Sequence, residues 1–370
     1  MSEDEPLRQP IVMADDAELG ALVALAGLPN LTPRRFWYLV EQGNLSETWA
    51  KVAAGRAPQQ GRQRDASERW ARWAAAIDPD NELLCHRNAG VHVLPYGSAG
   101  YPDELIDDPD PPVVIFKQGP QDVTDRIRVA VVGTRKCTGY GRDVALELGA
   151  GLADRGIDVV SGLASGIDAA AHAGALSSNS SHIVAVVAGG VDVIYPHRNA
   201  QLYQHAASSG ALISEWPLGS KPTTWRFPAR NRLVAALSAA TVVVESAAKG
   251  GSLYTVDEAL RRDRAVFAVP GPIYSPVSTG TNRLLAEGAY ALCSVDELLD
   301  TLAPRSQPKA EQATLGVDSW LLELIGWQPI PLDAVVDASG RSPGDVTLET
   351  ERLIGRGVLR RTGGLVERVA

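Results

Sequence analysis

Six short apolar segments, separated by stretches typical of helices, are the feature that most constrains how this chain folds. The apolar segments are 129–132, 157–160, 183–187, 211–213, 241–244 and 265–269, and the helical stretches between them include 142–155, 168–176, 198–208 and 252–262. Apolar strands without polar alternation are typical of a parallel sheet that helices cover on both faces. We therefore predict an α/β fold with a doubly wound, Rossmann-like parallel sheet, whose ligands bind beyond the carboxyl ends of the strands.

Changes of pattern divide the 370 residues into three regions, as the length of the chain allows. Residues 14–90 predict an N-terminal helical domain, in which Thr32 and Pro33 resemble an N-cap and a first-turn proline. This region fits either a helix-hairpin-helix module or a plain helical packing domain. Residues 91–302 hold the predicted sheet, and residues 303–315 read as a polar linker. Residues 316–370 predict three helices followed by two strands, which resemble a winged helix.

Composition narrows the classes of protein. The sequence lacks an apolar run long enough to span a membrane, and its acidic start lacks the apolar core of a secretory signal, so we expect a cytoplasmic protein. Cys85, Cys137 and Cys293 lie far apart, and the histidines form no metal-binding motif, so we expect neither a disulfide framework nor a metal site. Because the net charge is −9, a polyanion would need a local basic patch.

Glycine-containing loops follow four of the predicted strands. The residues that we single out in them are Gly133, Thr134, Arg135 and Lys136; Gly162, Ser165 and Gly166; Arg198, after the loop at 189–192; and Gly250, Gly251 and Ser252. Glycine lets the backbone approach a phosphate, and the helix that follows offers free N–H groups. The spacing fits neither the dinucleotide nor the Walker motif. Since all four loops would share one rim of the sheet, we predict a phosphate-binding face there.

A run of cations from Lys221 to Arg232 supplies a candidate basic patch. Its twelve residues hold four cations (Lys221, Arg226, Arg230 and Arg232), two aromatic rings (Trp225 and Phe227) and no acid. Cations interleaved with rings are typical of surfaces that bind single-stranded nucleic acid. The alternative is that the rings belong to the core and the arginines pair with acids elsewhere.

Six collinear motifs resemble those of the DNA-processing protein A (DprA/Smf) family, over residues 95–302. They are Val-Val-Gly-Thr-Arg (131–135) with Thr-Gly-Tyr-Gly (138–141), Ser-Gly-Leu-Ala-Ser-Gly-Ile-Asp (161–168), Gly-Val-Asp (190–192) with Tyr-Pro (195–196), Phe-Pro-Ala-Arg-Asn-Arg (227–232), Gly-Gly-Ser-Leu-Tyr-Thr (250–255) and Ala-Val-Pro-Gly (268–271). Two positions depart from the family pattern: Thr134 replaces a serine, and Lys249 precedes the glycine pair where the family often has serine.

The resemblance implies a function and partners. Members of this family bind single-stranded DNA, load the recombinase RecA onto it during natural transformation, and help to displace single-strand-binding protein. They form homodimers and have no established catalytic activity or cofactor. Because nothing in this sequence is suited to reading base edges, we expect binding without strong sequence preference. The resemblance implies that Arg135 grips the DNA backbone, that Lys221 and Arg198 add basic contacts, and that Trp225 stacks on a base. It also implies an N-terminal domain similar to SAM or helix-hairpin-helix modules and a C-terminal winged-helix-like domain.

Two other functions fit the same fold. One is a nucleotide phosphoribohydrolase, for which Asp257 and Glu258 would supply carboxylates, and the other is a sensor that binds a small nucleotide. The winged region has its own ambiguity, because Asp345, Glu349 and Glu351 lie on the helix that would face DNA. Acids there oppose phosphate, so we interpret that region as a protein-contact or weakly binding module.

Overall fold

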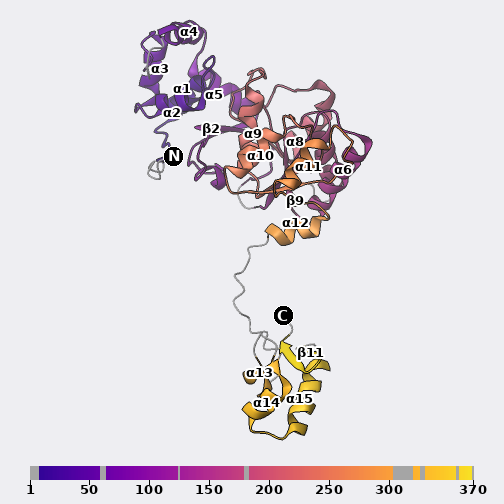
Figure 1. The fold of residues 1–370 in the computed structure, drawn as a ribbon. Coiled ribbons are helices and arrows are strands. Elements are labelled where there is room, and N and C mark those ends of the chain that lie inside the picture. The colour runs from indigo at the N-terminus through magenta and orange to yellow at the C-terminus, as the bar shows by residue number, and fades with distance from the viewer. Residues whose placement is uncertain are drawn as a thin grey trace. The chain divides into compact units, whose positions relative to one another are not determined.

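The computed structural model describes residues 8–58, 64–123, 126–178, 183–302, 320–325, 330–355 and 358–368. The chain folds into two compact units, divided between residues 303 and 304 (Figure 1). The predicted linker at 303–315 lies outside the described residues.

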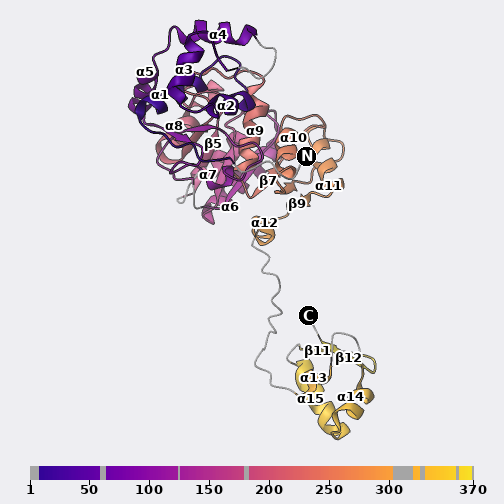
Figure 2. The same cartoon turned by 90° about the vertical axis from the view of Figure 1, so that its left-hand side faces the viewer.

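Five helices form the N-terminal part of the first unit. They are α1 (Asp16–Ala26), α2 (Pro33–Val40), α3 (Leu45–Ala53), α4 (Arg64–Ala74) and α5 (Pro79–Asn88). Thr32 and Pro33 take the predicted N-cap and first-turn positions of α2. Figures 1 and 2 show these helices together at one end of the sheet, where α5 contacts the first strand. They pack into the same unit as the sheet, so the predicted domain boundary at residue 90 stays a prediction.

A nine-stranded sheet forms the centre of the first unit. Its strands are β1 (Val91–Pro95), β2 (Val114–Gln118), β3 (Arg128–Val132), β4 (Asp158–Ser161), β5 (Ile183–Val186), β6 (Ala211–Ser214), β7 (Ala240–Val243), β8 (Ala265–Ala268) and β9 (Tyr290–Ala291). Their order is β1-β2-β6-β5-β4-β3-β7-β8-β9, and only β1 and β2 run antiparallel to their neighbours. The chain runs outward from β3 through β6 and then returns to β7, so the strand order reverses between β3 and β7. The predicted doubly wound α/β fold is confirmed.

Helices cover both faces of this sheet, which is why every residue of β3, β4 and β5 is buried. The helices are α6 (Gly139–Asp154), α7 (Ile167–Ser177), α8 (Ala200–Ser209), α9 (Arg226–Ala236), α10 (Leu253–Leu260), α11 (Thr279–Ala286) and α12 (Val295–Leu302), with 3₁₀ turns η1 (Asp103–Leu105) and η2 (His197–Asn199). Glycines let α6 and α7 touch, because a Cβ at Gly149 or Gly174 would overlap main-chain oxygens of the opposite helix.

Buried arginines hold the segment between β1 and β2 against the rest of the unit. Arg128 of β3 pairs with Glu104, Arg232 of α9 with Asp110, and Arg262, just after α10, with Asp108. The side chains of Arg262 and Asp108 are 3% and 2% exposed and are joined by two hydrogen bonds of 2.6 and 2.9 Å. These acids therefore fix residues 104–110 to three separate elements.

The second unit contains α13 (Leu321–Leu324), β10 (Ile330–Pro331), α14 (Leu332–Ser339), α15 (Pro343–Gly355), β11 (Leu359–Thr362) and β12 (Leu365–Arg368). Its strands form an antiparallel sheet in the order β10-β12-β11, and Gly363, at φ +65°, allows the tight turn between β11 and β12. The predicted three helices and strand pair are present. On α15, Glu349 pairs with Arg352, and Glu351 pairs with Arg361 of β11.

Within the described ranges, no helix combines the length and apolar character needed to cross a bilayer. The same residues hold no cluster of three or more His, Cys, Asp or Glu side chains arranged to bind a metal ion.

Candidate functional site

Two adjoining cavities lie at the carboxyl ends of the strands, where the strand order reverses. The larger, of about 440 Å³, is lined by the loops after β3 and β7 and by the start of α9. The smaller, of about 270 Å³, is lined by the loops after β3, β4 and β5 and by Phe227. Arg135, Lys136, Ala164 and Phe227 line both cavities, so the two lie side by side, and we call them together the rim groove. Open α/β sheets bind ligands at such a reversal of strand order.

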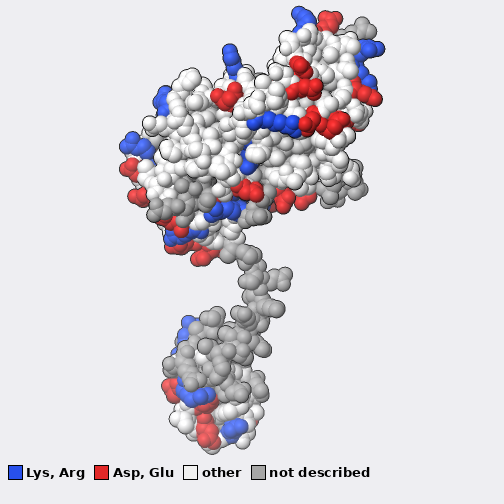
Figure 3. Space-filling model, turned by 180° about the vertical axis from the view of Figure 1, so that it is seen from behind, with Lys and Arg blue, Asp and Glu red and all other residues white. Residues whose placement is uncertain are grey.

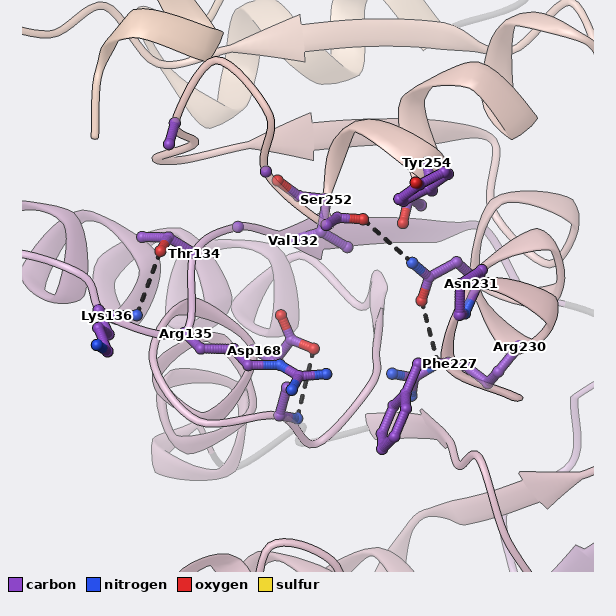
Figure 4. Close-up of a pocket in the computed structure, with 17 residues that line it drawn as sticks. Val132, Thr134, Arg135, Lys136, Asp168, Phe227, Arg230, Asn231, Ser252 and Tyr254 are labelled. Carbon is purple, nitrogen blue, oxygen red and sulfur yellow. Dashed lines mark hydrogen bonds between the residues drawn. The ribbon is translucent and has the colours of Figure 1, made fainter. Parts of the chain in front are cut away.

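Cations and aromatic rings alternate along the rim groove. The guanidinium of Arg135 lies 4.9 Å from the ring centre of Phe227, and that ring lies 5.6 Å from the ring of Tyr195. Tyr254, which is 58% exposed, lines the larger cavity, and Arg198 lines the smaller. Figure 4 shows Arg135 and Lys136 on one side of the larger cavity and Phe227 and Asn231 on the other. This arrangement can pair with phosphates and stack on bases along one path.

The N-terminus of α6 is filled by a carboxylate of the chain itself. Glu245, which follows β7 and is 3% exposed, accepts hydrogen bonds from the amide of Thr138 at 2.9 Å and from its hydroxyl at 2.6 Å. The Thr138 hydroxyl in turn accepts from the amide of Gly141 at 3.1 Å, and a Cβ at Gly141 would overlap Glu245. Glu245 therefore occupies part of the space at this helix start, while among the described residues none accepts a hydrogen bond from the amides of Gly139 and Tyr140.

The loop before α7 is also satisfied from within. Asp168 accepts hydrogen bonds from the amides of Gly162 at 3.1 Å and Ala164 at 3.4 Å, and burial raises the pKa of its carboxyl although Arg230 opposes the shift. Arg230 is 4% exposed and donates to the main-chain oxygens of Gly162, at 2.8 Å, and Val186. Burial lowers its pKa. Arg230 belongs to the predicted basic patch and lines the larger cavity, where its guanidinium is bonded to these main-chain oxygens.

The N-terminus of α10 is open by contrast. Gly251 is exposed, and a Cβ added there would meet no atom within 4 Å. The side-chain amide of Asn231 donates to the oxygen of Gly251 at 3.3 Å, and Ser252 donates its hydroxyl to Ser246 at 3.0 Å. Among the described residues, none accepts a hydrogen bond from the amides of Gly251 and Ser252. A helix N-terminus with free amides attracts anions.

Most of the predicted site residues line the rim groove. They are Gly133, Thr134, Arg135, Lys136, Gly162, Ser165, Arg198, Arg230, Gly250, Gly251 and Ser252. Gly166 lies behind the groove wall at φ +86°, where a Cβ would overlap the oxygen of Thr134. Its role is therefore to let the loops after β3 and β4 meet.

Helix α9 begins at Arg226, within the cation run, and the predicted residues of the run end up in different places, some buried and some exposed. Arg232 points into the protein, where its side chain is 5% exposed and pairs with Glu215, so it is removed from the interface. Trp225 is 40% exposed but lies outside the groove, 6.2 Å from the ring of Trp216. Lys221 is exposed and lines neither cavity. The alternative that the arginines pair with acids is thus correct for Arg232.

Several residues that line the groove were not predicted as site residues, among them Tyr195, Asn231 and Tyr254. Phe227, which lines both cavities, was noted only as a ring within the cation run. All four lie inside or directly beside the motifs quoted above. Their position next to a glycine loop or to Arg230 could therefore have identified them from the sequence.

The family model described as DNA recombination-mediator protein A matches residues 92–303, more than half of the chain. The chain belongs to this family. The resemblance predicted from six motifs is thereby confirmed, and membership in the DNA recombination-mediator protein A family assigns the chain to DNA processing in recombination. The second unit lies outside the matched residues.

Relatives and solved structures agree with this membership. DNA processing protein DprA of Bacillus subtilis (strain 168) is 39% identical over 225 residues, which cover 60% of this chain and 75% of the relative. Protein Smf of Escherichia coli (strain K12) is 36% identical over 274 residues, 70% and 72% of the two chains. The X-ray structure of DprA from Streptococcus pneumoniae superposes with a TM-score of 0.64 at 31% identity, covering 78% of this chain and 98% of that one.

Proposed function

We propose that the rim groove binds single-stranded DNA without strong sequence preference. The observation that carries this proposal is the continuous path of Arg198, Arg135, Lys136, Phe227 and Tyr254 across the sheet edge, in a chain whose net charge is −9. On the face drawn in Figure 3, basic and acidic side chains are interspersed, so a polyanion depends on this local arrangement. A solved relative, DNA processing protein A from Helicobacter pylori, is described by its single-stranded DNA binding mode and superposes with a TM-score of 0.52 at 29% identity.

Each group in the groove has a role in this proposal. Phosphates contact Arg135, Lys136, Arg198 and the open amides before α10, and bases stack on Phe227 and Tyr254. Stacking tolerates every base because each has a π face, so sequence preference is slight. Asp168, whose charge lies beside Arg230 and whose oxygens accept backbone amides, does not repel the strand as a free carboxylate would.

We further propose, from the family resemblance, that the bound strand is the substrate on which RecA is loaded during transformation and recombination. Displacement of single-strand-binding protein and assembly as a homodimer belong to the same proposal. Lys221 and Trp225, which lie beside the start of α9 and outside the groove, would contact DNA that continues past Phe227.

Binding without catalysis is supported by the position of the carboxylates that the hydrolase alternative requires. Glu258 accepts hydrogen bonds from Arg261 and Arg262, and neither Asp257 nor Glu258 lines the groove. Release of free base from a panel of nucleoside monophosphates would contradict the proposal. Tighter binding of a mononucleotide than of an oligonucleotide would favour the sensor alternative.

The test is a fluorescence-anisotropy titration of a labelled poly-dT oligonucleotide. Arg135→Ala/Lys136→Ala should weaken binding about tenfold or more and reduce the log-log salt slope by about 1.4, since each phosphate contact on a single strand contributes about 0.7. Arg155→Ala is the matched control, because Arg155 follows the C-terminus of α6 at the opposite edge of the sheet and pairs there with Asp296. Equal loss in both variants would place the DNA elsewhere.

A further inference from the structure

A braced turn after β8 presents two large apolar side chains to solvent. Ile273 is 77% exposed and Tyr274 is 93% exposed. The amide of Ser275 donates to the oxygen of Pro272 at 3.0 Å, which closes the turn around these two residues. At its base, Gly271 exchanges two hydrogen bonds, of 3.2 and 3.0 Å, with the side chain of Asn282. Hydrogen bonds at its base therefore hold the turn in shape, while the side chains at its tip are mostly exposed to solvent.

The composition of this tip is unusual. Turn tips are ordinarily occupied by Gly, Asn, Asp or Ser, whose side chains favour water and local hydrogen bonds. Here the tip carries Ile273 and Tyr274, and Tyr140 of α6, itself 52% exposed, donates its hydroxyl to the oxygen of Pro270 at 3.4 Å. We call Tyr140, Ile273 and Tyr274 the turn patch. Apolar surface that a fold holds out to solvent marks a place of contact with another molecule.

The turn patch continues the line of the rim groove. The groove uses the loops after β5, β4, β3 and β7, and β8 is the next strand in the same parallel order. Neighbouring strands lie about 4.8 Å apart, so the loop after β8 begins one such step beyond the groove. The amide of Gly280 donates to the oxygen of Ser246 at 2.8 Å, and a Cβ at Gly280 would lie 2.7 Å from the oxygen of Ala247, which lines the groove.

The stretch around the turn carries no acid of its own. Residues 264–286 contain Arg264 and Arg283, although Arg283 pairs with Glu287, just after this stretch, at 2.7 Å. A strand that leaves the groove beside Tyr254 would therefore meet an aromatic surface without carboxylates from this stretch to repel it.

We propose that Tyr274 stacks on a base of the same single strand after it leaves the rim groove, with Ile273 and Tyr140 beside it. This rests on the proposed function of the groove and extends it, since the turn patch lengthens the site by one or two nucleotides. The partner is single-stranded DNA, because continuity with the groove and the acid-free stretch both favour it over a protein surface.

The experiment compares Tyr274→Ala and Tyr274→Phe over a series of labelled dT oligonucleotides from 4 to 16 nucleotides, lengths of about the size that single-strand sites span. With the longer oligonucleotides, Tyr274→Ala should bind about tenfold more weakly, the effect of losing one stacked base, whereas Tyr274→Phe keeps its ring and should bind like the wild type. With the shortest oligonucleotide that binds, all three proteins should have the same affinity. Because Tyr274 is almost fully exposed, neither substitution should alter folding.

Three results would overturn the inference. Equal binding of Tyr274→Ala and wild type at every length would exclude the stacking contact, and so would an equal loss in Tyr274→Phe. A change of sedimentation from dimer to monomer in Tyr274→Ala would make the turn patch an interface between copies of the chain. Failure of the groove itself is distinguishable, because Arg135→Ala/Lys136→Ala would then leave the affinity for the shortest oligonucleotide unchanged.

Discussion

The N-termini of α6 and α10 flank the same reversal of strand order, yet they differ in what occupies them. At α6, Glu245 accepts hydrogen bonds from Thr138 and fills the space beside Gly141. At α10, Gly251 is exposed with free space around its Cα, and no carboxylate of the described residues bonds to its amide. The chain places a carboxylate beside the start of α6, and no carboxylate of the described residues takes the corresponding place at α10.

This difference shows that position in a doubly wound fold does not by itself identify the phosphate site. Both ends have glycines, a following helix and a place at the sheet edge. At α6 an internal carboxylate acts as the anion, and its main-chain oxygen also accepts from the amide of Thr134 at 2.8 Å. Glu245 therefore holds the loop that carries Arg135 and Lys136, while the start of α10 is where we propose that a phosphate binds.

Removal of the internal anion should have the largest effect on stability. Glu245→Ala loses two hydrogen bonds to a buried carboxylate, which should lower the free energy of unfolding by about 4 kcal/mol, at about 2 kcal/mol for each charge-assisted bond. Glu245→Gln keeps the size and one acceptor, so its loss should be less than half as large. Chemical denaturation followed by tryptophan fluorescence measures both. Equal stability of wild type and Glu245→Ala would remove the distinction between the two helix ends.

Acid pH should lower the stability of the fold through His172, which is fully buried in the middle of α7. Burial lowers the pKa of His172 to about 4. An unfolded histidine titrates near about 6.5, so the unfolded state binds the proton first as the pH falls. The free energy of unfolding is therefore unaffected by His172 above pH ~6.5. It falls by about 3 kcal/mol as the pH drops from ~6.5 to ~4, because only the unfolded state binds the proton in that range.

The control for this pH effect is His172→Leu, which cannot titrate. Burial raises the pKa of Asp158 to about 6, and this carboxyl acts in the opposite direction, since the folded state gains its proton first as the pH falls. Because Asp158 titrates in both proteins, the difference between the wild-type and His172→Leu stability curves isolates the histidine. A difference that stays constant from pH 7 to pH 4 would refute the assignment.

Alanine substitutions at one glycine of each helix start should differ in their cost to stability. Gly141→Ala places a methyl group against Glu245 and should cost about 2 kcal/mol of stability, as overpacking of a buried site does. Gly251→Ala adds a methyl group in free space and should change stability by less than about 0.5 kcal/mol. Thermal unfolding of the pair measures this, and similar costs at both positions would mean that α10 is as tightly packed as α6.

Valine at two surface glycines should give the smallest effect, and only on DNA binding. Gly139 and Gly251 both have free space for a side chain, and they lie at the filled and open ends respectively. Gly251→Val should weaken binding of a dT oligonucleotide about fivefold, because the side chain keeps phosphate from the amides of α10. Gly139→Val should bind as the wild type does. The reverse order of affinities would place the phosphate at α6.

The sheet and the rim were predictable from sequence because their signals are local. Each buried strand is a short apolar run, and the six predicted runs coincide with β3 to β8 within about one residue at most ends. The carboxyl ends of parallel strands share one edge, so the glycine loops after β3, β4, β5 and β7 could be assigned to one face before any contact was known. Strands β1, β2 and β9 were not predicted. Most of β2 lies in the apolar run 113–116, which was overlooked, whereas a histidine interrupts β1 and β9 has only two residues.

The chemistry of individual side chains was less predictable because it depends on distant partners. Glu245 lies 107 residues from Thr138, and nothing next to it in the sequence shows that its carboxylate turns into α6. Arg232 belongs to a run of one sign that resembles a surface, but helix α9 directs it towards Glu215, 17 residues away, and Asp110, 122 residues away. Helical periodicity divides such a run between surface and core, which a count of charges does not reveal.

The segment between β1 and β2 has a consequence for synthesis of the chain. Asp108 leaves the ribosome 154 residues before Arg262, the arginine with which it forms a buried pair. Until α10 has been made, this carboxylate has no partner there, and burial without one is costly. The N-terminal part of the unit therefore cannot settle into its final contacts during the early part of translation. Vectorial synthesis delays closure of the unit until the residues that form the rim groove have nearly all emerged.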